Sequence, residues 1–243
     1  MADEPKVVET EEKEVKDALR KFLDPAYPLL SRFRDACPGT YKHSQTLASL
    51  TEGAAMALDL DVIKMQIAAQ YHDIGKMFAP KFFIENQATN ENPHDDLAPE
   101  ISYTVITRHV SDSVAILIND HTFPRDIIEV ISQHHGTSVL KYFFDKSKSE
   151  DEEGYRYKTN KPSSIESAVL MIADRVEATA KALSGNDNFN TMDIVETTIN
   201  DLLNDGQLDL VYMKLGDLKI IKEVFSKELE GTNLKRVDYS KME

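Results

Sequence analysis

Residues 165–183 read IESAVLMIADRVEATAKAL, a stretch that is apolar on most sides when wound as a helix. A helix that is apolar nearly all round belongs in the centre of a protein and not on its surface. The carboxylate of Asp174 directly follows the run AVLMIA (168–173). The sequence therefore predicts a central helix that carries an ionisable side chain into the core.

A helix predicted between Pro124 and Gly136 places histidines where apolar residues are expected. Its inward positions, spaced i, i+3, i+4, i+7 and i+8, are Ile127, Val130, Ile131, His134 and His135. This spacing marks the buried face of an amphipathic helix. The last two positions of that face therefore bring imidazoles into the interior.

Further ionisable groups occupy inward positions on other predicted helices. His43 heads the apolar stripe of a helix that starts near residue 40, and His109 follows Val105 by one turn on a helix whose inward face also includes Ile101 and Ile116. The pair His72-Asp73 lies where another helix should end before Gly75. Each position alone has an ordinary explanation, such as a hydrogen-bonded core histidine or an aspartate paired with an arginine.

Together these residues predict a metal centre. Buried ionisable groups cost several kcal/mol unless they are paired or bound to a metal. A shared centre accounts for all of them at once: His43, His72, Asp73, His109, His134, His135 and Asp174. Imidazoles and carboxylates without thiolates suit Mn, Fe, Zn or Ni. Because seven side chains exceed the needs of one ion, we expect two ions joined by a carboxylate.

Composition and charge exclude several classes of protein. The 243 residues are 41% hydrophobic and 29% charged, which is ordinary for a globular chain of one or two domains. The net charge of −14 opposes binding to nucleic acid polymers, so no such partner is expected. No run of 18 apolar residues could span a membrane, and the N-terminus lacks the apolar core of a signal peptide. One cysteine, Cys37, forms no internal disulfide and fits a reducing, cytoplasmic location.

The periodicity is helical almost throughout, so the expected fold is an all-α bundle with the metal site in its core. Over residues 1–23 we expect a charged, solvated arm, with a helix that has Val15, Leu19 and Phe22 at helical spacing as the alternative, and over 24–243 we expect a single domain. Within it, the metal-binding core covers about 40–185 and two C-terminal helices lie at about 190–230. The charged segment 145–163 is expected to be a mobile or lid-like excursion.

The ordered series H…HD…H…HH…D resembles the HD-domain metal-dependent phosphohydrolases, named for a doublet such as His72-Asp73. Several stretches closely resemble the cytosolic HD domain of PgpH-type proteins, the seven-transmembrane HD receptors that hydrolyse cyclic di-AMP. They are YHDIGKMFAPKFFIENQ (71–87), NPHDDLAPEIS (92–102), ISQHHGTSVLKYFF (131–144), SAVLMIADRVEATAKAL (167–183) and GQLDLVYMKLGDLKII (206–221). The resemblance covers about residues 36–235.

The resemblance implies a phosphodiesterase with two divalent ions, Mn or Fe, that opens cyclic di-AMP to pApA. One ion would take His43, His72, Asp73 and Asp174, and the other Asp73, His109, His134 and His135. Asp73 would bridge the ions, and a bridging hydroxide would attack phosphorus. Lys76 would contact the phosphate, with a solvent-exposed lysine at a helix end as the alternative.

The resemblance also implies smaller roles. His94 would orient substrate or protonate the leaving oxygen, or else only hold its loop. Glu85 and Asn86 would bind outer-shell groups or the second imidazole nitrogens. Tyr155 and Tyr157 would stack on a base or simply pack their segment, and no role is assigned to His121.

Alternative functions remain open at the level of sequence. One is hydrolysis of cyclic di-GMP or another nucleotide, although HHGTSVLKYFF lacks the Gly-Tyr-Pro signature of the cyclic di-GMP branch. Another is a non-catalytic nucleotide sensor. The stretch Tyr155–Pro162 (YRYKTNKP) departs in its middle from the Phe-Arg-Tyr-Pro-Gly-Pro-Lys-Pro typical of the family. The family's membrane helices are also absent, so the chain is expected to be either an excised cytosolic domain or a stand-alone relative.

Overall fold

A computed structural model describes residues 14–87, 92–183 and 190–234, and the expected all-α fold is confirmed for them. The longer helices are α2 (Pro28–Ala36), α3 (Pro38–Ala57), α4 (Val62–Tyr71), α5 (Pro99–Asn119), α6 (Arg125–Ser132), α7 (Lys141–Ser147), α8 (Ile165–Leu183), α9 (Thr191–Asn204) and α10 (Leu215–Leu234). Short 3-10 turns are η1 (Lys21–Leu23), η2 (Ile74–Phe78), η3 (Pro80–Phe82), η4 (Ile84–Asn86) and η5 (Glu153–Tyr155). In these residues β-structure is limited to one isolated bridge, Val139 to Arg156.

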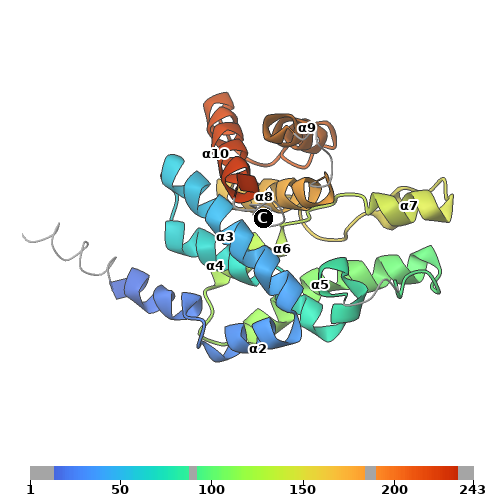
Figure 1. Cartoon of the computed structure of the whole chain (residues 1–243), viewed down its shortest axis with the longest axis horizontal. Helices are drawn as coiled ribbons and strands as arrows, with labels where there is room; N and C mark the ends of the chain where they lie inside the picture. Colours follow the sequence, from blue (N-terminus) through green and yellow to red (C-terminus); the bar gives the residue numbers. More distant parts are fainter. Residues whose placement is uncertain (1–13, 88–91, 184–189, 235–243) are drawn as a thin grey trace, which may run out of the picture.

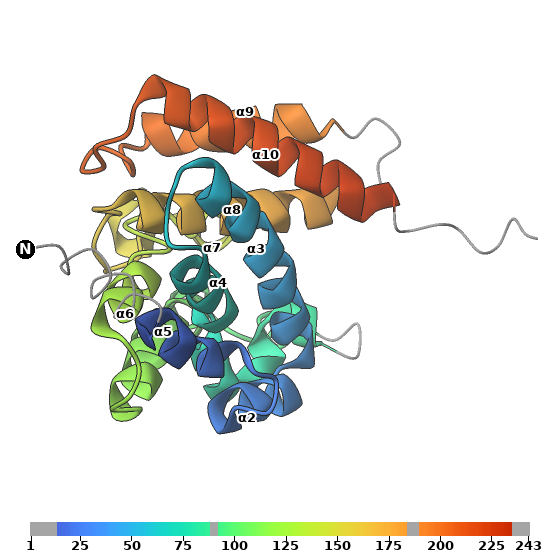
Figure 2. The same cartoon turned by 90° about the vertical axis from the view of Figure 1, so that its left-hand side faces the viewer.

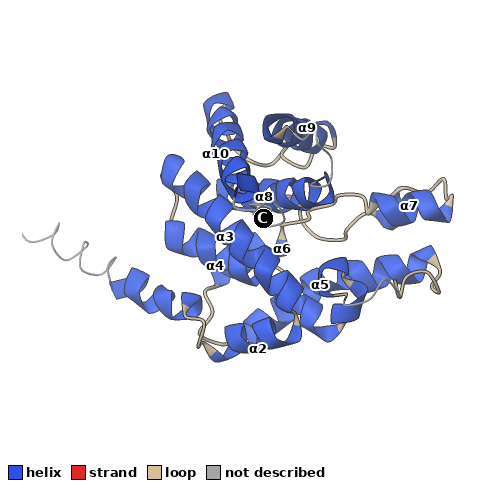
Figure 3. Cartoon of the chain, viewed as in Figure 1, coloured by secondary structure: helices blue, strands red, loops and turns tan. Residues whose placement is uncertain are grey.

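The helix α8 lies in the middle of the molecule, as its composition predicts. Figure 2 shows it between the pair α9 and α10 on one side and α4 and α6 on the other. Residues 168–173 are at most 2% exposed, because helices contact this segment from several directions. α3 packs against α4, α8 and α10, so it closes the core along one side (Figure 1). In the described residues, loops and turns without strands join the helices (Figure 3). Four of the seven candidate ligands, His72, Asp73, His134 and His135, lie in turns just beyond a helix end.

The expected solvated arm is wrong at its C-terminal end. Leu19 and Phe22 are buried in the core, and the Tyr71 hydroxyl donates to the carbonyl of Phe22 at 2.8 Å. Residues 1–13 of the arm lie outside the described residues. The alternative of a helix with Leu19 and Phe22 at helical spacing describes residues 14–23, although Val15 is exposed.

Two helices differ in detail from the expectation. α6 ends at Ser132, so His134 and His135 lie in the following turn, and Gly136 closes that turn with a φ of +53°. On α5, Ile101 is 52% exposed and does not belong to the buried face. That face contains the expected His109 together with Ser102 and Ser113. The small serine at 113 lets α5 approach the chain at Gly75 closely.

The segment 145–163 is more firmly packed than the expected lid-like excursion. Tyr155 and Tyr157 are each only 5% exposed. The Tyr155 hydroxyl donates to Glu100 at 2.8 Å, and the backbone N–H of Tyr157 donates to the carbonyl of Ser138. The second half of this segment therefore belongs to the wall of the domain.

Candidate metal centre

The His72-Asp73 pair lies at a tight turn where α4 ends and η2 begins. The expected role of Gly75 as the helix end is wrong, since α4 already ends at Tyr71. A Cβ atom at Gly75 would lie 2.1 Å from the carbonyl oxygen of His109 and 2.5 Å from the amide nitrogen of Ser113. Glycine is therefore required because the backbone of η2 touches that of α5. The Ser113 hydroxyl fixes this contact, accepting from the Gly75 N–H and donating to the His72 carbonyl.

A first cluster consists of His43, His72 and Asp73, whose ligand atoms lie within 4.8 Å of one another. His72 Nε2 is 3.1 Å from Asp73 Oδ2, and His43 Nε2 is 3.9 Å from the same oxygen. Asp174 joins this group from α8, with Oδ1 at 3.1 Å from His43 Nε2 and 3.7 Å from His72 Nε2. Three separate segments thus bring four of the predicted ligands together.

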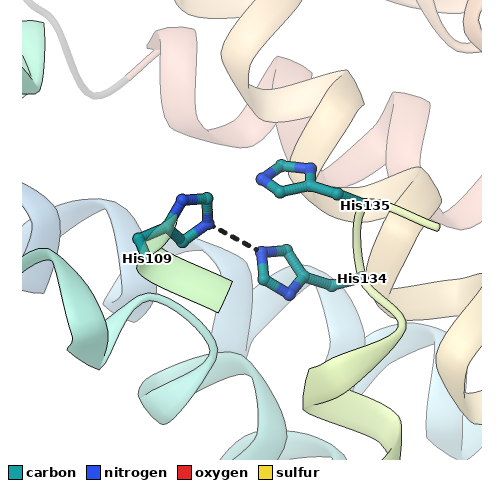
Figure 4. A group of neighbouring side chains, drawn as sticks. All are labelled: His109, His134 and His135. Carbon is teal, nitrogen blue, oxygen red and sulfur yellow. Dashed lines mark hydrogen bonds between the residues drawn. The ribbon is translucent and has the colours of Figure 1, made fainter. Parts of the chain in front are cut away.

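A second cluster consists of His109, His134 and His135 (Figure 4). His109 comes from α5, whereas His134 and His135 come from the turn after α6. The Nε2 atoms of His109 and His134 face each other at 3.3 Å. His109 and His134 are buried, whereas the His135 side chain is 24% exposed.

Asp73 lies between the two clusters and offers a different oxygen to each. Its Oδ2 faces His72 and His43, while its Oδ1 is 3.2 Å from His109 Nε2 and 3.8 Å from His134 Nε2. This is the geometry expected of a bridging carboxylate. The structure therefore brings all seven predicted ligands to one place.

Hydrogen bonds at the opposite ring nitrogen set the tautomer of four histidines. The Nδ1 atoms of His72, His109 and His134 lie 2.6–2.8 Å from the backbone carbonyls of Ala69, Ile106 and Ile131, each three residues earlier in the chain. His43 Nδ1 is 2.8 Å from Glu177 Oε2. Because each partner oxygen accepts, Nδ1 carries a proton and Nε2 is the nitrogen left to bind a metal.

These contacts fit a cation better than a metal-free core. With Nδ1 protonated in both rings, the lone pairs of His109 Nε2 and His134 Nε2 point at each other at 3.3 Å, which is repulsive unless a cation or proton lies between them. Buried atoms without a hydrogen-bond partner include His72 Nε2 and Asp73 Oδ1, which face the two clusters. Buried polar atoms seldom lack a partner, and an ion at each cluster would supply one.

Burial and neighbouring charges shift the pKa values of several histidines in the clusters. Burial by itself lowers the pKa of His43, but hydrogen bonds to Asp174 and Glu177 raise it to about 9. In His72, burial is likewise outweighed, mainly by the charge of Asp73, and the pKa is raised to about 10. Burial and the neighbouring histidines lower the pKa of His134 to about 3. Without a metal, the first cluster therefore holds protons that a metal would displace, and His134 is already neutral.

Lys76 lies within this centre, so the alternative of a solvent-exposed lysine is wrong. Its Nζ is 2.6 Å from Asp73 Oδ2 and 2.9 Å from Glu85 Oε1, and the side chain is 13% exposed. Burial would lower the pKa of Lys76, but the two carboxylates raise it. The lysine is therefore a fixed positive charge at the edge of the metal centre.

The centre opens into a cavity of about 470 Å³. Its polar lining contains carboxylates from Asp73, Glu85, Asp174 and Glu177, with Lys76 and Lys181 as the lining cations. Its apolar lining includes Phe83, Ile84, Ile106, Ala178 and Ala182. A phosphate would meet more negative than positive side chains here, so metal cations are needed to make the site attractive to it.

Some predicted outer residues have other contacts. The second imidazole nitrogens bind backbone carbonyls and Glu177, so the expected imidazole partners Glu85 and Asn86 are wrong in that role. Glu85 instead pairs with Lys76 and accepts from the Thr40 hydroxyl. Asn86 Oδ1 accepts from the N–H groups of Gly39 and Thr40 at the start of α3.

His94 does not line the cavity. Its Nε2 is 2.9 Å from the Phe82 carbonyl, and its ring lies against Phe82 and Phe143, so the alternative of a loop-holding histidine describes its contacts. Tyr155 packs against Tyr103 away from the cavity, whereas Tyr157 lines it. His121 is exposed.

The sequence did not predict a role for Glu177 or the contact between Tyr157 and His135. Glu177, one helical turn after Asp174 on α8, holds His43, and the spacing i, i+3 on the central helix was the available signal. The ring of Tyr157 stacks on that of His135 with centroids 4.4 Å apart and an interplanar angle of 32°. The sequence placed Tyr157 in the segment 145–163 but gave no sign that its ring contacts the candidate metal ligand His135.

Comparisons with known proteins give matches in sequence and in structure. The HD domain family model matches residues 40–179. The chain is 35% identical over 225 residues to "Cyclic-di-AMP phosphodiesterase PgpH" of Bacillus subtilis and 36% identical to the protein of that name from Listeria monocytogenes, covering 91% of this chain in each case. It spans only 32% and 31% of the lengths of these two relatives.

A solved structure of the Listeria monocytogenes PgpH HD domain has a TM-score of 0.79 and 37% identity, covering 85% of this chain and 99% of that one. A second structure of that domain, in complex with cyclic di-AMP, has a TM-score of 0.80 and 35% identity, covering 86% and 99%. In the described residues, no helix has the length and apolar character needed to cross a bilayer. From the matched residues and the shared fold, the chain belongs to the HD-domain family.

Proposed function

We propose that this chain is a metal-dependent phosphodiesterase that hydrolyses cyclic di-AMP to pApA. The observation that carries the proposal is the position of Asp73, which turns one oxygen to each of two histidine clusters at the base of an open cavity. Relatives named cyclic-di-AMP phosphodiesterases, and an HD domain solved with cyclic di-AMP, support the choice of substrate.

We infer two divalent transition-metal ions, Mn or Fe, one at each cluster. Their residues would be His43, His72, Asp73 and Asp174 for one ion and Asp73, His109, His134 and His135 for the other. When bound, such ions activate a water molecule as nucleophile and stabilise charge on the phosphate. Imidazole and carboxylate donors suit both metals, so the donor set supports Mn and Fe alike.

The side chains around the clusters would position the substrate. The Nζ of Lys76 is held by Asp73 and Glu85, so its charge has a fixed place from which to contact a phosphate oxygen. The apolar wall, including Ile84 and Ile106, suits the flat faces of nucleobases. A cavity of about 470 Å³ is within the range of small-molecule sites.

We also propose a cytoplasmic location and a single HD unit over residues 24–243. Support comes from the one cysteine, Cys37, which is buried and unpaired as expected in a reducing compartment. The continuous core that joins α3, α8 and α10 supports one unit. In the longer relatives, the matching third of the chain carries the HD fold, and we propose that the present residues have the same place next to a membrane portion.

Product analysis by chromatography tests the proposed function. Purified protein with Mn²⁺ or Fe²⁺ is incubated separately with cyclic di-AMP and cyclic di-GMP, beside the Asp73→Ala variant. We expect metal-dependent conversion of cyclic di-AMP to pApA, slow turnover of cyclic di-GMP and no turnover by the variant. Equal turnover of both would refute the substrate assignment, and binding without turnover by the metal-loaded wild type would indicate a sensor.

A further inference from the structure

The turn that carries two of the candidate ligands, Gln133–Thr137 (QHHGT), lies beyond the end of α6. We call it the HH turn. Its backbone forms tight-turn bonds such as that from the Gly136 N–H to the Gln133 carbonyl at 2.9 Å, and side chains from segments distant in sequence hold it as well. On its N-terminal side, the Gln133 amide exchanges hydrogen bonds with Ser163, accepting from its N–H at 3.0 Å and donating to its hydroxyl at 3.1 Å.

On its C-terminal side, the HH turn is held by the loop between α9 and α10. The buried amide of Gln207 accepts from the backbone N–H of Thr137 at 3.0 Å and donates to the Thr137 hydroxyl at 3.1 Å. Gln207 Nε2 also lies 2.8 Å from Asp205 Oδ2. The chain approaches closely here, because a Cβ atom at Gly136 would lie 2.4 Å from Gln207 Oε1.

Arg156 binds the other backbone group of Thr137, its carbonyl. Its Nη1 donates to the carbonyl of Thr137 at 2.9 Å, and its guanidinium forms two bonds with the carboxylate of Asp205, at 2.9 and 3.2 Å. Both backbone groups of Thr137 are therefore bound by side chains that Asp205 in turn orients. A bidentate arginine–carboxylate pair fixes geometry well.

From these contacts we propose that Gln207, with Asp205, is a positioning residue for the metal ligands His134 and His135. This rests on the proposed metal site and goes beyond it, since residues 205–207 are not among the predicted ligands and lie beyond residues 40–179, which the HD domain model matches. The hydrogen bonds of Gln207 reach the HH turn, so we expect the effect at the second cluster. The ligands of the first ion come from α3, the turn after α4 and, with Asp174, from α8, and Gln207 is hydrogen-bonded to none of them.

The test uses the full chain and the variant Gln207→Met, which keeps a side chain of similar length but cannot accept from the Thr137 N–H. The matched control is Thr137→Val, which removes the hydroxyl but leaves the backbone N–H bond to Gln207. Binding of Co²⁺ is followed by its visible absorption and by calorimetry, and thermal unfolding of each metal-free variant checks folding. Loss of partners outside the ligand shell typically weakens metal binding about 10–100-fold.

We expect Gln207→Met to weaken one Co²⁺ binding step about tenfold while the other stays within about twofold of wild type. Thr137→Val should leave both steps within about twofold. Wild-type affinity at both steps in Gln207→Met would overturn the inference, as would equal weakening of both, which indicates general destabilisation. Failure of the wild type itself to bind Co²⁺ would refute the proposed metal site instead.

Discussion

The carboxylate of Glu177 provides a quantitative test of how the first cluster is organised. Its Oε2 accepts the Nδ1 proton of His43 at 2.8 Å, and both side chains are about nine-tenths buried, with exposed fractions of 12% and 8%. This bond directs the Nε2 lone pair of His43 toward the metal position. The change Glu177→Gln preserves shape and one accepting oxygen but removes the charge.

The expected magnitude follows from the kind of hydrogen bond that is lost. A bond to a charged group contributes about 1.5–3 kcal/mol and a neutral one about 0.5–1.5 kcal/mol. The difference of about 1–1.5 kcal/mol corresponds to roughly tenfold weaker metal binding. Glu177→Ala, which removes the acceptor altogether, should weaken binding toward 100-fold.

Calorimetric titration with Mn²⁺ measures this effect, and Glu166→Gln is the control. Glu166 lies on the same helix, α8, but lines a separate cavity beside Lys64. Mn²⁺ affinity should be unchanged in the control. The reasoning would be refuted by wild-type Mn²⁺ affinity in both Glu177 variants. Normal affinity with abolished hydrolysis would show that Glu177 contacts substrate and does not orient His43.

Three further predictions concern packing, stacking and pH. Gly75→Ala should lower the free energy of unfolding by about 3 kcal/mol in urea denaturation, because its Cβ would meet backbone atoms that cannot yield, and an unchanged midpoint would contradict the close contact. Tyr157→Ala should weaken Mn²⁺ binding roughly two- to tenfold through loss of the ring on His135, whereas Tyr157→Phe should not, and equal loss in both would contradict a stacking role. Burial would raise the pKa of Asp205, but hydrogen bonds from Arg156 and Gln207 outweigh burial and lower the pKa. The ionised carboxylate therefore stabilises the fold at pH values above its ordinary pKa, and this stabilisation is lost as the pH falls. Between about pH 5 and pH 3, the free energy of unfolding of the wild type should therefore fall more than that of Asp205→Asn in chemical denaturation. An equal fall in the two proteins would contradict this prediction.

The parts of the fold that sequence predicted are those determined by local periodicity. The apolar run around Asp174 gives the central α8 because no other position buries all its sides, and the inward histidines could be found because they replace apolar residues in such patterns. The end of α6 could not be placed this way. Periodicity continues through His134 and His135, while the actual helix end depends on Gly136 and on contacts from Ser163 and Gln207.

The supporting residues were hidden for the same reason. Glu177, Gln207 and Arg156 are ordinary polar residues in sequence, and only the fold shows that each holds a ligand or its turn. The spacing of Leu19 and Phe22 indicated a helix, but the charges around them favoured a solvated segment, and only contacts with other helices decide that they are buried.

The most direct test of the account is the number of metal ions bound per chain. Protein loaded with Mn²⁺ and freed of excess metal is examined by elemental analysis, beside His43→Ala and His134→Ala. The account predicts about two ions in wild type and about one in each variant, because each substitution removes a ligand from a different cluster while Asp73 remains. A single ion in wild type, or loss of all metal in both variants, would contradict two clusters joined by one carboxylate.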